Sequence, residues 1–127
     1  MQGIEKLKNI QARQKAATDA GVPALQRLYQ VAQGSSGQCR YIARFLASCY
    51  NGYRFPFDLT DLRAIDHELW LDCMAVLAMD AHPAQEVHRY FEDGGKKWEA
   101  MIERWGLEDE QAERAQQLLR DRAHGDD

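Results

Sequence analysis

Several absences restrict the class of this protein. Its 127 residues include only three prolines and an ordinary charged fraction of 28%, which indicates a folded chain rather than a disordered linker. The three cysteines, Cys39, Cys49 and Cys73, form no CxxC pair and are odd in number, which predicts reduced thiols in the core of a cytoplasmic protein. No window approaches eighteen consecutive apolar residues, and the first nine residues lack a signal-peptide core. We therefore expect neither secretion nor contact with a membrane.

The motifs of common catalytic and nucleotide-binding sites are also missing. The sequence contains no GxSxG elbow, no P-loop and no Rossmann glycine pattern. The segment 34–37 is too short to cradle a phosphate and is typical of the start of a helix. The sequence therefore offers no catalytic residue and no cofactor site.

Two clusters of metal-binding residue types occur, but neither places three ligands on one helical face. Glu68 and Asp72 are one turn apart, as are His82 and Glu86. A single helix that holds a divalent metal usually needs further ligands from elsewhere. We expect no bound metal, and an enzyme that uses the carboxylates of residues 66–72 is retained only as a remote alternative.

What the chain does contain is helical periodicity. Nowhere do β-branched residues alternate with period two, so no strand is predicted. Breaks or caps are expected at Gly21–Pro23, Gly34–Ser35, Asn51–Gly52, His82–Pro83 and Gly94–Gly95. The sequence predicts an all-α fold, a single compact bundle-like domain of five to seven helices over residues 1–127.

The two ends of the chain are expected to contribute least to this domain. Beyond Ile10 the apolar side chains of the first helix shrink to alanines, and Gly21 followed by Pro23 should end that helix and start another. Residues 1–20 are therefore predicted to form a loosely docked N-terminal helix. Residues 124–127 are predicted to be a frayed tail.

The centre of the core is expected in the most apolar long stretch, from Leu59 to about Met79. Asp58 should cap this segment, and a break near Asp66 would divide it. The predicted inaccessible side chains are those of Trp70, Cys73, Met74 and Leu77. Phe57, Leu59 and Leu62 are predicted to staple the preceding loop to the core. A capping box of Ser35 and Gln38 is expected to start the helix over residues 36–50.

The charges are unevenly distributed along the chain, although the net charge is only −4. Residues 21–57 contain four arginines and no acid, whereas residues 58–95 contain nine acids and two arginines. Tyrosines interleave with these arginines, a mixture typical of nucleic-acid surfaces. The candidate surface for a protein partner or a nucleic acid consists of Arg27, Arg40, Arg44, Tyr53 and Arg54.

An intramolecular explanation of these arginines is favoured. A basic helix that is followed by an acidic one has obvious partners within the fold. Arg40 and Arg44 are therefore expected to pair with the acids of the following segment, which are Asp58, Asp61, Asp66 and Asp72.

A combination of short motifs carries a family likeness. The motifs are Gly37-Gln38-x-Arg40-x-x-Ala43-x-Phe45-Leu46, Tyr50-Asn51, Phe57-Asp58-Leu59-Thr60-Asp61-Leu62, Asp66, and Asp72-x-Met74-x-Val76-Leu77. Together they resemble an uncharacterised family of small proteobacterial proteins that are often encoded on plasmids and integrative elements. The likeness covers about residues 25–80. It implies a genomic setting but no activity, cofactor or catalytic residue.

Three function classes follow from these observations. The leading one is a small acidic protein-interaction module, an accessory or inhibitory factor of a bacterial mobile element that binds a protein partner. The alternative is a nucleic-acid-binding accessory protein that uses residues 27–54, and the second alternative is the enzyme. Overall acidity favours the first over the second, because nucleic acids are polyanions.

Overall fold

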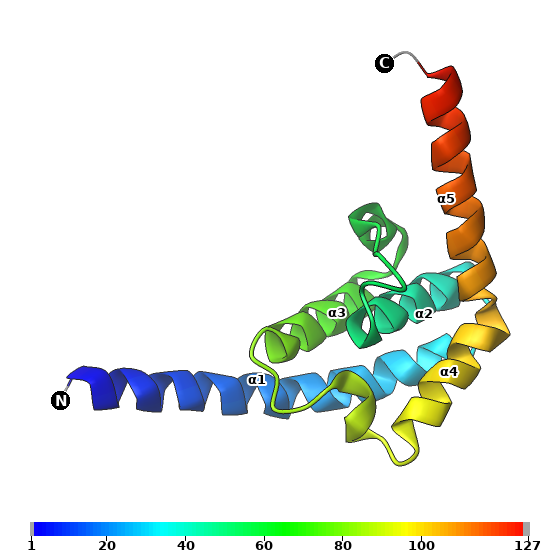
Figure 1. The fold of residues 1–127 in the computed structure, drawn as a ribbon. Coiled ribbons are helices and arrows are strands. Elements are labelled where there is room, and N and C mark those ends of the chain that lie inside the picture. The colour runs from blue at the N-terminus through cyan, green and yellow to red at the C-terminus, as the bar shows by residue number, and fades with distance from the viewer. Residues whose placement is uncertain (1, 126–127) are drawn as a thin grey trace.

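The computed structural model describes residues 2–125, and all of its regular elements are helices (Figure 1). In chain order they are α1 (Gln2–Ala32), α2 (Gly37–Tyr50), the 3-10 helix η1 (Leu59–Ala64), α3 (His67–Asp80), the 3-10 helix η2 (Val87–Tyr90), α4 (Gly94–Trp105) and α5 (Leu107–His124). The described residues contain no strand, and none of their helices is both long and apolar enough to cross a membrane. The all-α prediction of a single compact domain is confirmed.

The core lies where the second half of α1 meets α2, α3 and α4. Leu25 and Leu28 of α1 and Leu46 of α2 are fully buried there. Trp98 of α4 is also fully buried, and its indole Nε1 donates a hydrogen bond to the Leu46 carbonyl at 3.0 Å. This bond lets a large aromatic side chain enter the core without leaving its N–H unpaired.

The predicted break at Gly21–Pro23 is wrong, because α1 is one continuous helix of 31 residues. Gly21 is not a helix cap: a Cβ atom there would lie 2.6 Å from the Cβ of Met79, so glycine lets α1 and α3 approach closely. Pro23 lies on the exposed side of α1. The Asp19 carbonyl, which would otherwise accept a hydrogen bond from residue 23, can therefore be solvated instead.

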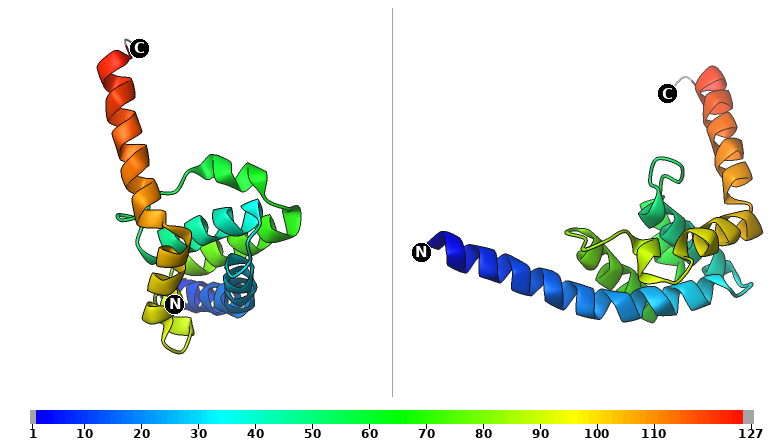
Figure 2. Two further views of the ribbon diagram at one scale, coloured as in Figure 1. Left: turned by 90° about the vertical axis from the view of Figure 1, so that its right-hand side faces the viewer. Right: turned by 60° about the horizontal axis from the view of Figure 1, so that its bottom comes forward.

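Both ends of the chain project from the core as helices (Figures 1 and 2). The first part of α1 extends past the end of α3, and all side chains of residues 2–13 are exposed. At the other end, every residue from 112 to 125 is exposed. Helix α5 includes His124, the first residue of the predicted frayed tail, while Met1 and residues 126–127 lie outside the described residues.

The segment before α3 is organised largely as predicted. The Asp58 carboxylate accepts hydrogen bonds from the backbone N–H of Thr60 at 2.9 Å and from its hydroxyl at 2.7 Å. Asp58 therefore caps η1, and these bonds, the hydroxyl's first, lower its pKa. The predicted break near Asp66 is also confirmed, because η1 and α3 are separate helices.

Two local predictions in this region fail. Leu59 is exposed and does not staple the loop, although Phe57 packs edge-on against Phe45. The capping box is also wrong, because Gln38 bonds to a different element. Its amide oxygen accepts from the Asp66 backbone N–H at 2.6 Å, and its amide nitrogen donates to the Asp66 carboxylate at 3.1 Å.

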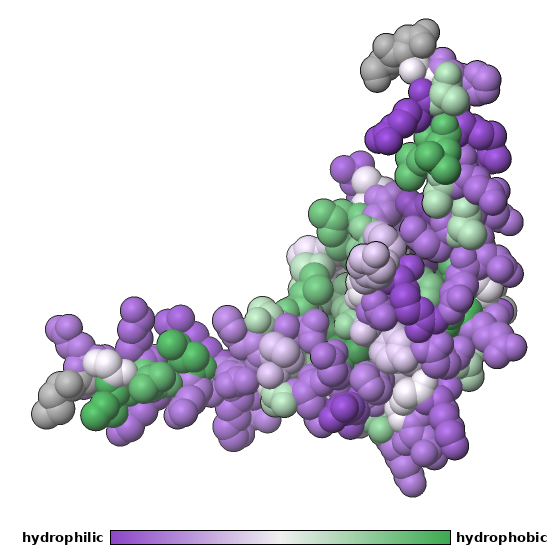
Figure 3. Space-filling model, in the orientation of Figure 1, coloured by the Kyte–Doolittle hydropathy of each residue, from purple (hydrophilic) through white to green (hydrophobic). Residues whose placement is uncertain are grey.

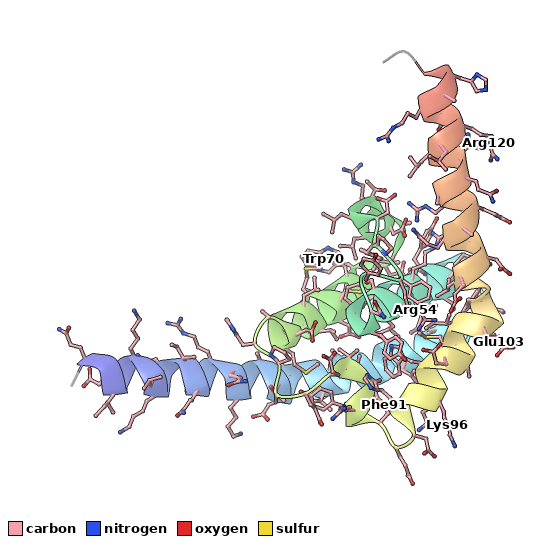
Figure 4. All side chains as sticks on the ribbon, viewed as in Figure 1. Arg54, Trp70, Phe91, Lys96, Glu103 and Arg120 are labelled. Atoms are coloured by element: carbon pink, nitrogen blue, oxygen red, sulfur yellow. The ribbon has the colours of Figure 1, made fainter. Side chains whose placement is uncertain are left out.

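The prediction that Trp70, Cys73, Met74 and Leu77 are inaccessible is wrong for Trp70 and Leu77. Cys73 is fully buried, but Trp70 and Leu77 are 37% and 42% exposed. Trp70 lies on the side of α3 that faces away from α1 (Figure 4). The reason is tertiary: α1 and the other helices cover one side of α3, and no neighbouring element among the described residues covers the other.

Candidate protein-binding surface

The exposed part of α1, residues 2–20, is called the arm here, and its apolar side chains continue the face that α1 buries in the core. Large apolar residues in the arm occur at Ile4, Leu7 and Ile10. Ile4 and Leu7 belong to a series of positions spaced alternately three and four residues apart along α1. The same series continues through Gly21, Leu25, Leu28 and Ala32, which are buried in the core. This is the spacing of a helix–helix packing face, and polar Gln11 and Gln14 occupy two of its intermediate positions.

The arm face is exposed because α3 is too short to cover it. The contacts of Gly21 with Met79 and of Arg27 with Asp72 show that α1 and α3 run antiparallel. Helix α3 ends at Asp80, which is level with the residues just before Gly21. From there towards the N-terminus, the same apolar face of α1 is left in solvent, and it shows as a patch of hydrophobic atoms on the arm (Figure 3).

Basic side chains border the arm face on both sides. At 100° per residue, Lys6 and Arg13 fall on one edge of the face, and Lys8 and Lys15 fall on the other. Lys15 also forms an exposed ion pair with Asp19 at 2.8 Å. Such an exposed pair contributes little and exchanges readily for another partner. The arm therefore presents an apolar stripe between two basic borders.

A cleft lies where the arm meets the end of α3. Its volume is about 190 Å³, and it is lined by Ile10, Arg13, Gln14, Ala17, Ala78 and His82. The Gln14 amide donates a hydrogen bond to the His82 carbonyl at 2.9 Å, which joins the arm to the segment after α3. Ile10 belongs both to the cleft lining and to the apolar stripe of the arm, so the cleft adjoins that stripe.

The five residues of the surface predicted from the sequence lie on three segments of the chain, and the contacts of Arg40, Arg44 and Arg54 meet at the start of α5. Arg27 forms a two-point contact with Asp72 across the α1–α3 junction, with N···O distances of 2.9 and 3.1 Å. Tyr53 is 97% exposed in the loop after α2. Arg27 therefore lies on α1 and Tyr53 in the loop after α2, whereas Arg40 and Arg44 lie on α2 itself.

Arg40 and Arg44 converge on Glu110 of α5. Arg40 Nη1 and Arg44 Nε each lie 2.6 Å from a different carboxylate oxygen of Glu110. Burial alone would raise the pKa of Glu110, but the hydrogen bond and charge of Arg44, together with Arg40, lower it. Asp61, which lies 3.4 Å from Arg44, has a raised pKa because burial outweighs that contact.

These contacts only partly match the sequence-based expectation. Of the acids predicted to pair with Arg40 and Arg44, only Asp61 does so, with Arg44. The main partner, Glu110, is 66 residues beyond Arg44 and could not be assigned without knowing where α5 docks.

Arg54 is also engaged within the chain (Figure 4). It hydrogen-bonds to Glu99 at 2.8 Å and to Glu108, and these carboxylates, Glu99 first, raise the pKa of its guanidinium. Tyr50 donates a hydrogen bond to the same Glu99. All four arginines of the predicted surface therefore have carboxylate partners inside the fold.

The carboxylates of residues 66–72 do not come together as a site. Asp66 bonds to Gln38, Glu68 is exposed, and Asp72 pairs with Arg27. Across residues 2–125, no group of three or more histidine, cysteine, aspartate or glutamate side chains is arranged to hold a metal ion.

Comparison with known proteins places the folded core in a family. A model described as a family of unknown function (DUF7673) matches residues 22–106. The chain belongs to this family. No curated protein and no solved structure matches it. The DUF7673 match includes residues 25–80, which carried the resemblance seen in the sequence, and it confirms an uncharacterised family.

The bounds of the DUF7673 match separate the folded core from the two projecting ends of the chain. The match begins at Val22, just after the arm, and ends at Gly106, immediately before α5. The core and α3 are therefore family features, whereas the arm and α5 lie outside the matched residues. Sequence reasoning predicted that the large apolar side chains of the first helix end at Ile10, but it missed the continuity with the core because it placed a break at Gly21.

Proposed function

We propose that the protein is a protein-binding module, and that its arm binds an acidic amphipathic helix of a partner protein. The observation that carries this proposal is the uncovered face of Ile4, Leu7 and Ile10 on a rigid extension of a core helix. Large apolar side chains arranged at helix-packing spacing on a projecting helix are typical of a helical interaction site.

The charge around the face supports an acidic partner. Lys6, Lys8, Arg13 and Lys15 line both borders of the stripe, so a helix with glutamate or aspartate beside its apolar residues would gain attraction along its whole length. Two arms packed against each other would bring these borders together with like charge. The arm is therefore suited to a different partner rather than to a second arm.

The arm is less suited to nucleic acid or to a lipid surface. Proteins that bind nucleic acids usually present a continuous basic and polar surface to them, whereas the centre of the arm face is apolar. Helices that lie in a membrane surface carry a broad apolar face, often with tryptophan or phenylalanine, whereas Gln11 and Gln14 interrupt this one.

The proposal also concerns the biological setting. The motif pattern of residues 25–80 resembles proteins encoded on plasmids and integrative elements. We propose that the protein acts in the bacterial cytoplasm as an accessory or inhibitory factor of such an element. An inhibitor of this kind would mask a helix that its target needs for another contact.

Site-specific photo-crosslinking in the native host tests the proposal. A photoreactive amino acid replaces Leu7 on the arm or, as a matched control, Leu118 on the exposed part of α5. We expect the Leu7 probe alone to crosslink a protein, within a segment that forms an acidic amphipathic helix. Reversal of Lys6, Lys8, Arg13 and Lys15 to glutamate should abolish the crosslink.

Three results would contradict the proposal. They are identical crosslinks from both positions, a crosslink that survives the charge reversal, and crosslinks only to nucleic acid or lipid.

A further inference from the structure

One face of α3 is apolar and uncovered, although it belongs to the family core. The α3 face, as we call it, consists of the exposed Trp70, Leu71, Leu77 and Ala78 around the half-buried Met74. Cys73, Val76 and Met79 point to the opposite side and are buried. Contiguous exposed apolar side chains on a folded core are typical of an interaction surface, so the α3 face is a candidate for one.

The chemistry of the α3 face is that of an interface centre. Within α3, all of which the structure describes, no charged side chain projects from this face: Glu68 and Asp72 point well away from it, and Asp72 pairs with Arg27. Tryptophan is enriched at binding hot spots, while charged residues are depleted there. His67 stacks on Trp70 with ring centroids 5.7 Å apart and holds the indole in place.

The order of large and small side chains along the α3 face suits pairing with a second, antiparallel copy of the same face. If two α3 helices pack antiparallel around a twofold axis at Met74, Trp70 of one copy lies opposite Ala78 of the other. Leu71 then lies opposite Leu77. The largest side chain thus meets the smallest, which allows close packing, and a twofold contact repeats every favourable pair.

A cleft at the start of α3 extends this match. It has a volume of about 340 Å³ and is lined by Leu62, Ile65, His67 and Trp70. In the antiparallel arrangement, the end of α3 from the second copy approaches this cleft. The absence of charge on the α3 face means that self-association meets no like-charge repulsion, in contrast to the arm.

We infer that a second copy of this chain covers the α3 face, with the two α3 helices antiparallel and Met74 on the twofold axis. This inference goes beyond the proposed function, because it concerns a different surface and a different partner. The arm variants described above should leave self-association unchanged.

Solution mass is the first test. The intact protein should approach twice its chain mass of 14.6 kDa as its concentration rises in sedimentation equilibrium. Leu77→Glu should remove the dimer, because it places a charge in the contact. Leu77 is 42% exposed, so the variant should keep the helical CD spectrum and melt cooperatively. Lys8→Glu is the matched control on the arm and should leave the dimer intact.

Cysteine crosslinking tests the register. Met74→Cys should give an intermolecular disulfide under mild oxidation, because residue 74 of one copy lies beside residue 74 of the other. Glu68→Cys, on the same helix, should not, because its two copies are about 18 Å apart along the helix axes at 1.5 Å per residue. Both are measured on non-reducing gels against the parent protein, whose own three cysteines provide the background.

Three results would overturn the inference. A monomer at every concentration excludes self-association, and a dimer that persists in Leu77→Glu uses another surface. Equal crosslinking of Met74→Cys and Glu68→Cys would show random collision or another register.

Discussion

The arm and α5 both project from the core with exposed apolar side chains, but they are held in different ways. The arm is the continuation of a helix whose second half is buried through Ala24, Leu25 and Leu28. Helix α5 buries only Leu107, and it is otherwise held by ion pairs of Glu108 and Glu110 with arginines of the core and by a longer one, 3.7 Å, between Arg114 and Asp58. Packing therefore fixes the direction of the arm, whereas charge fixes the direction of α5.

The arm and α5 also differ in how the chain connects them to the core. The arm joins the core through unbroken helix, while α5 follows α4 after a turn at Gly106, whose φ of 62° lies in the left-handed region. A turn of this kind sets a direction only when contacts on both sides hold it. The comparison teaches that the arm should keep its orientation across pH and salt, and that α5 should not.

The largest expected effect comes from removing the packing under the arm. Leu28→Ala deletes a fully buried side chain of α1 and should lower the free energy of unfolding by about 2–5 kcal/mol. Urea unfolding followed by CD measures this change. Leu7→Ala on the arm is the control and should change stability by less than about 0.5 kcal/mol. Equal losses would mean that the arm is packed as tightly as the core.

A smaller effect is expected at the close approach of α1 and α3. Gly21→Ala improves helix propensity by about 1 kcal/mol, but its new Cβ would lie 2.6 Å from the Cβ of Met79. Overpacking of this kind typically costs about 1–3 kcal/mol, so we expect net destabilisation in a thermal melt. Gly3→Ala, which has no neighbour within 4 Å, should cause none. A stabilised Gly21→Ala would show that the two helices separate easily.

The anchor of α5 can be broken without disturbing the arm. Glu110→Gln keeps the side-chain shape but removes the charge that Arg40 and Arg44 share at 2.6 Å. The three side chains are partly exposed, so we expect a loss of about 1–2 kcal/mol in the docking of α5. Hydrogen exchange should accelerate in α5 and stay unchanged in α1, with Glu113→Gln as the exposed control. Faster exchange in both helices would contradict the distinction.

Acid should have the mildest effect on the same anchor. The pKa of Glu110 is lowered in the fold, so its contribution is complete above its ordinary pKa near 4.5 and is lost as the pH falls through the lowered value. The pKa of Asp61 is raised, so its protonation acts in the opposite direction and offsets part of the loss. After correction for the pH dependence of intrinsic amide exchange, α5 should therefore lose less protection between pH 7 and pH 3 than Glu110→Gln loses at pH 7. No acid dependence in the parent protein would argue against a charge-held α5.

Local signals in the sequence were enough for the helices and some of their caps. Asp58 was identified as a cap because a carboxylate before a helical run accepts free backbone N–H groups, and the break near Asp66 followed from the same pattern. At Gly21 the same reasoning failed. Glycine is used both to end helices and to let two helices approach, and only the position of Met79 shows which applies.

The binding surfaces were less accessible to sequence reasoning. The apolar side chains of α3 were predicted to be buried. Periodicity cannot show that Trp70 and Leu77 face solvent, because that depends on which side of α3 the other helices cover. Likewise, a stripe at Ile4, Leu7 and Ile10 is visible in the sequence, while its exposure depends on α3 ending at Asp80.

From the sequence alone, the helical class, the approximate ends of most helices and the cap at Asp58 could be inferred. These follow from spacing and from residue chemistry, which act over a few neighbouring residues. Only the tertiary structure decided that Glu110 would gather Arg40 and Arg44, and that the arm and the α3 face would remain uncovered. Contacts between residues far apart in the chain depend on how whole helices pack, and no local pattern encodes that arrangement.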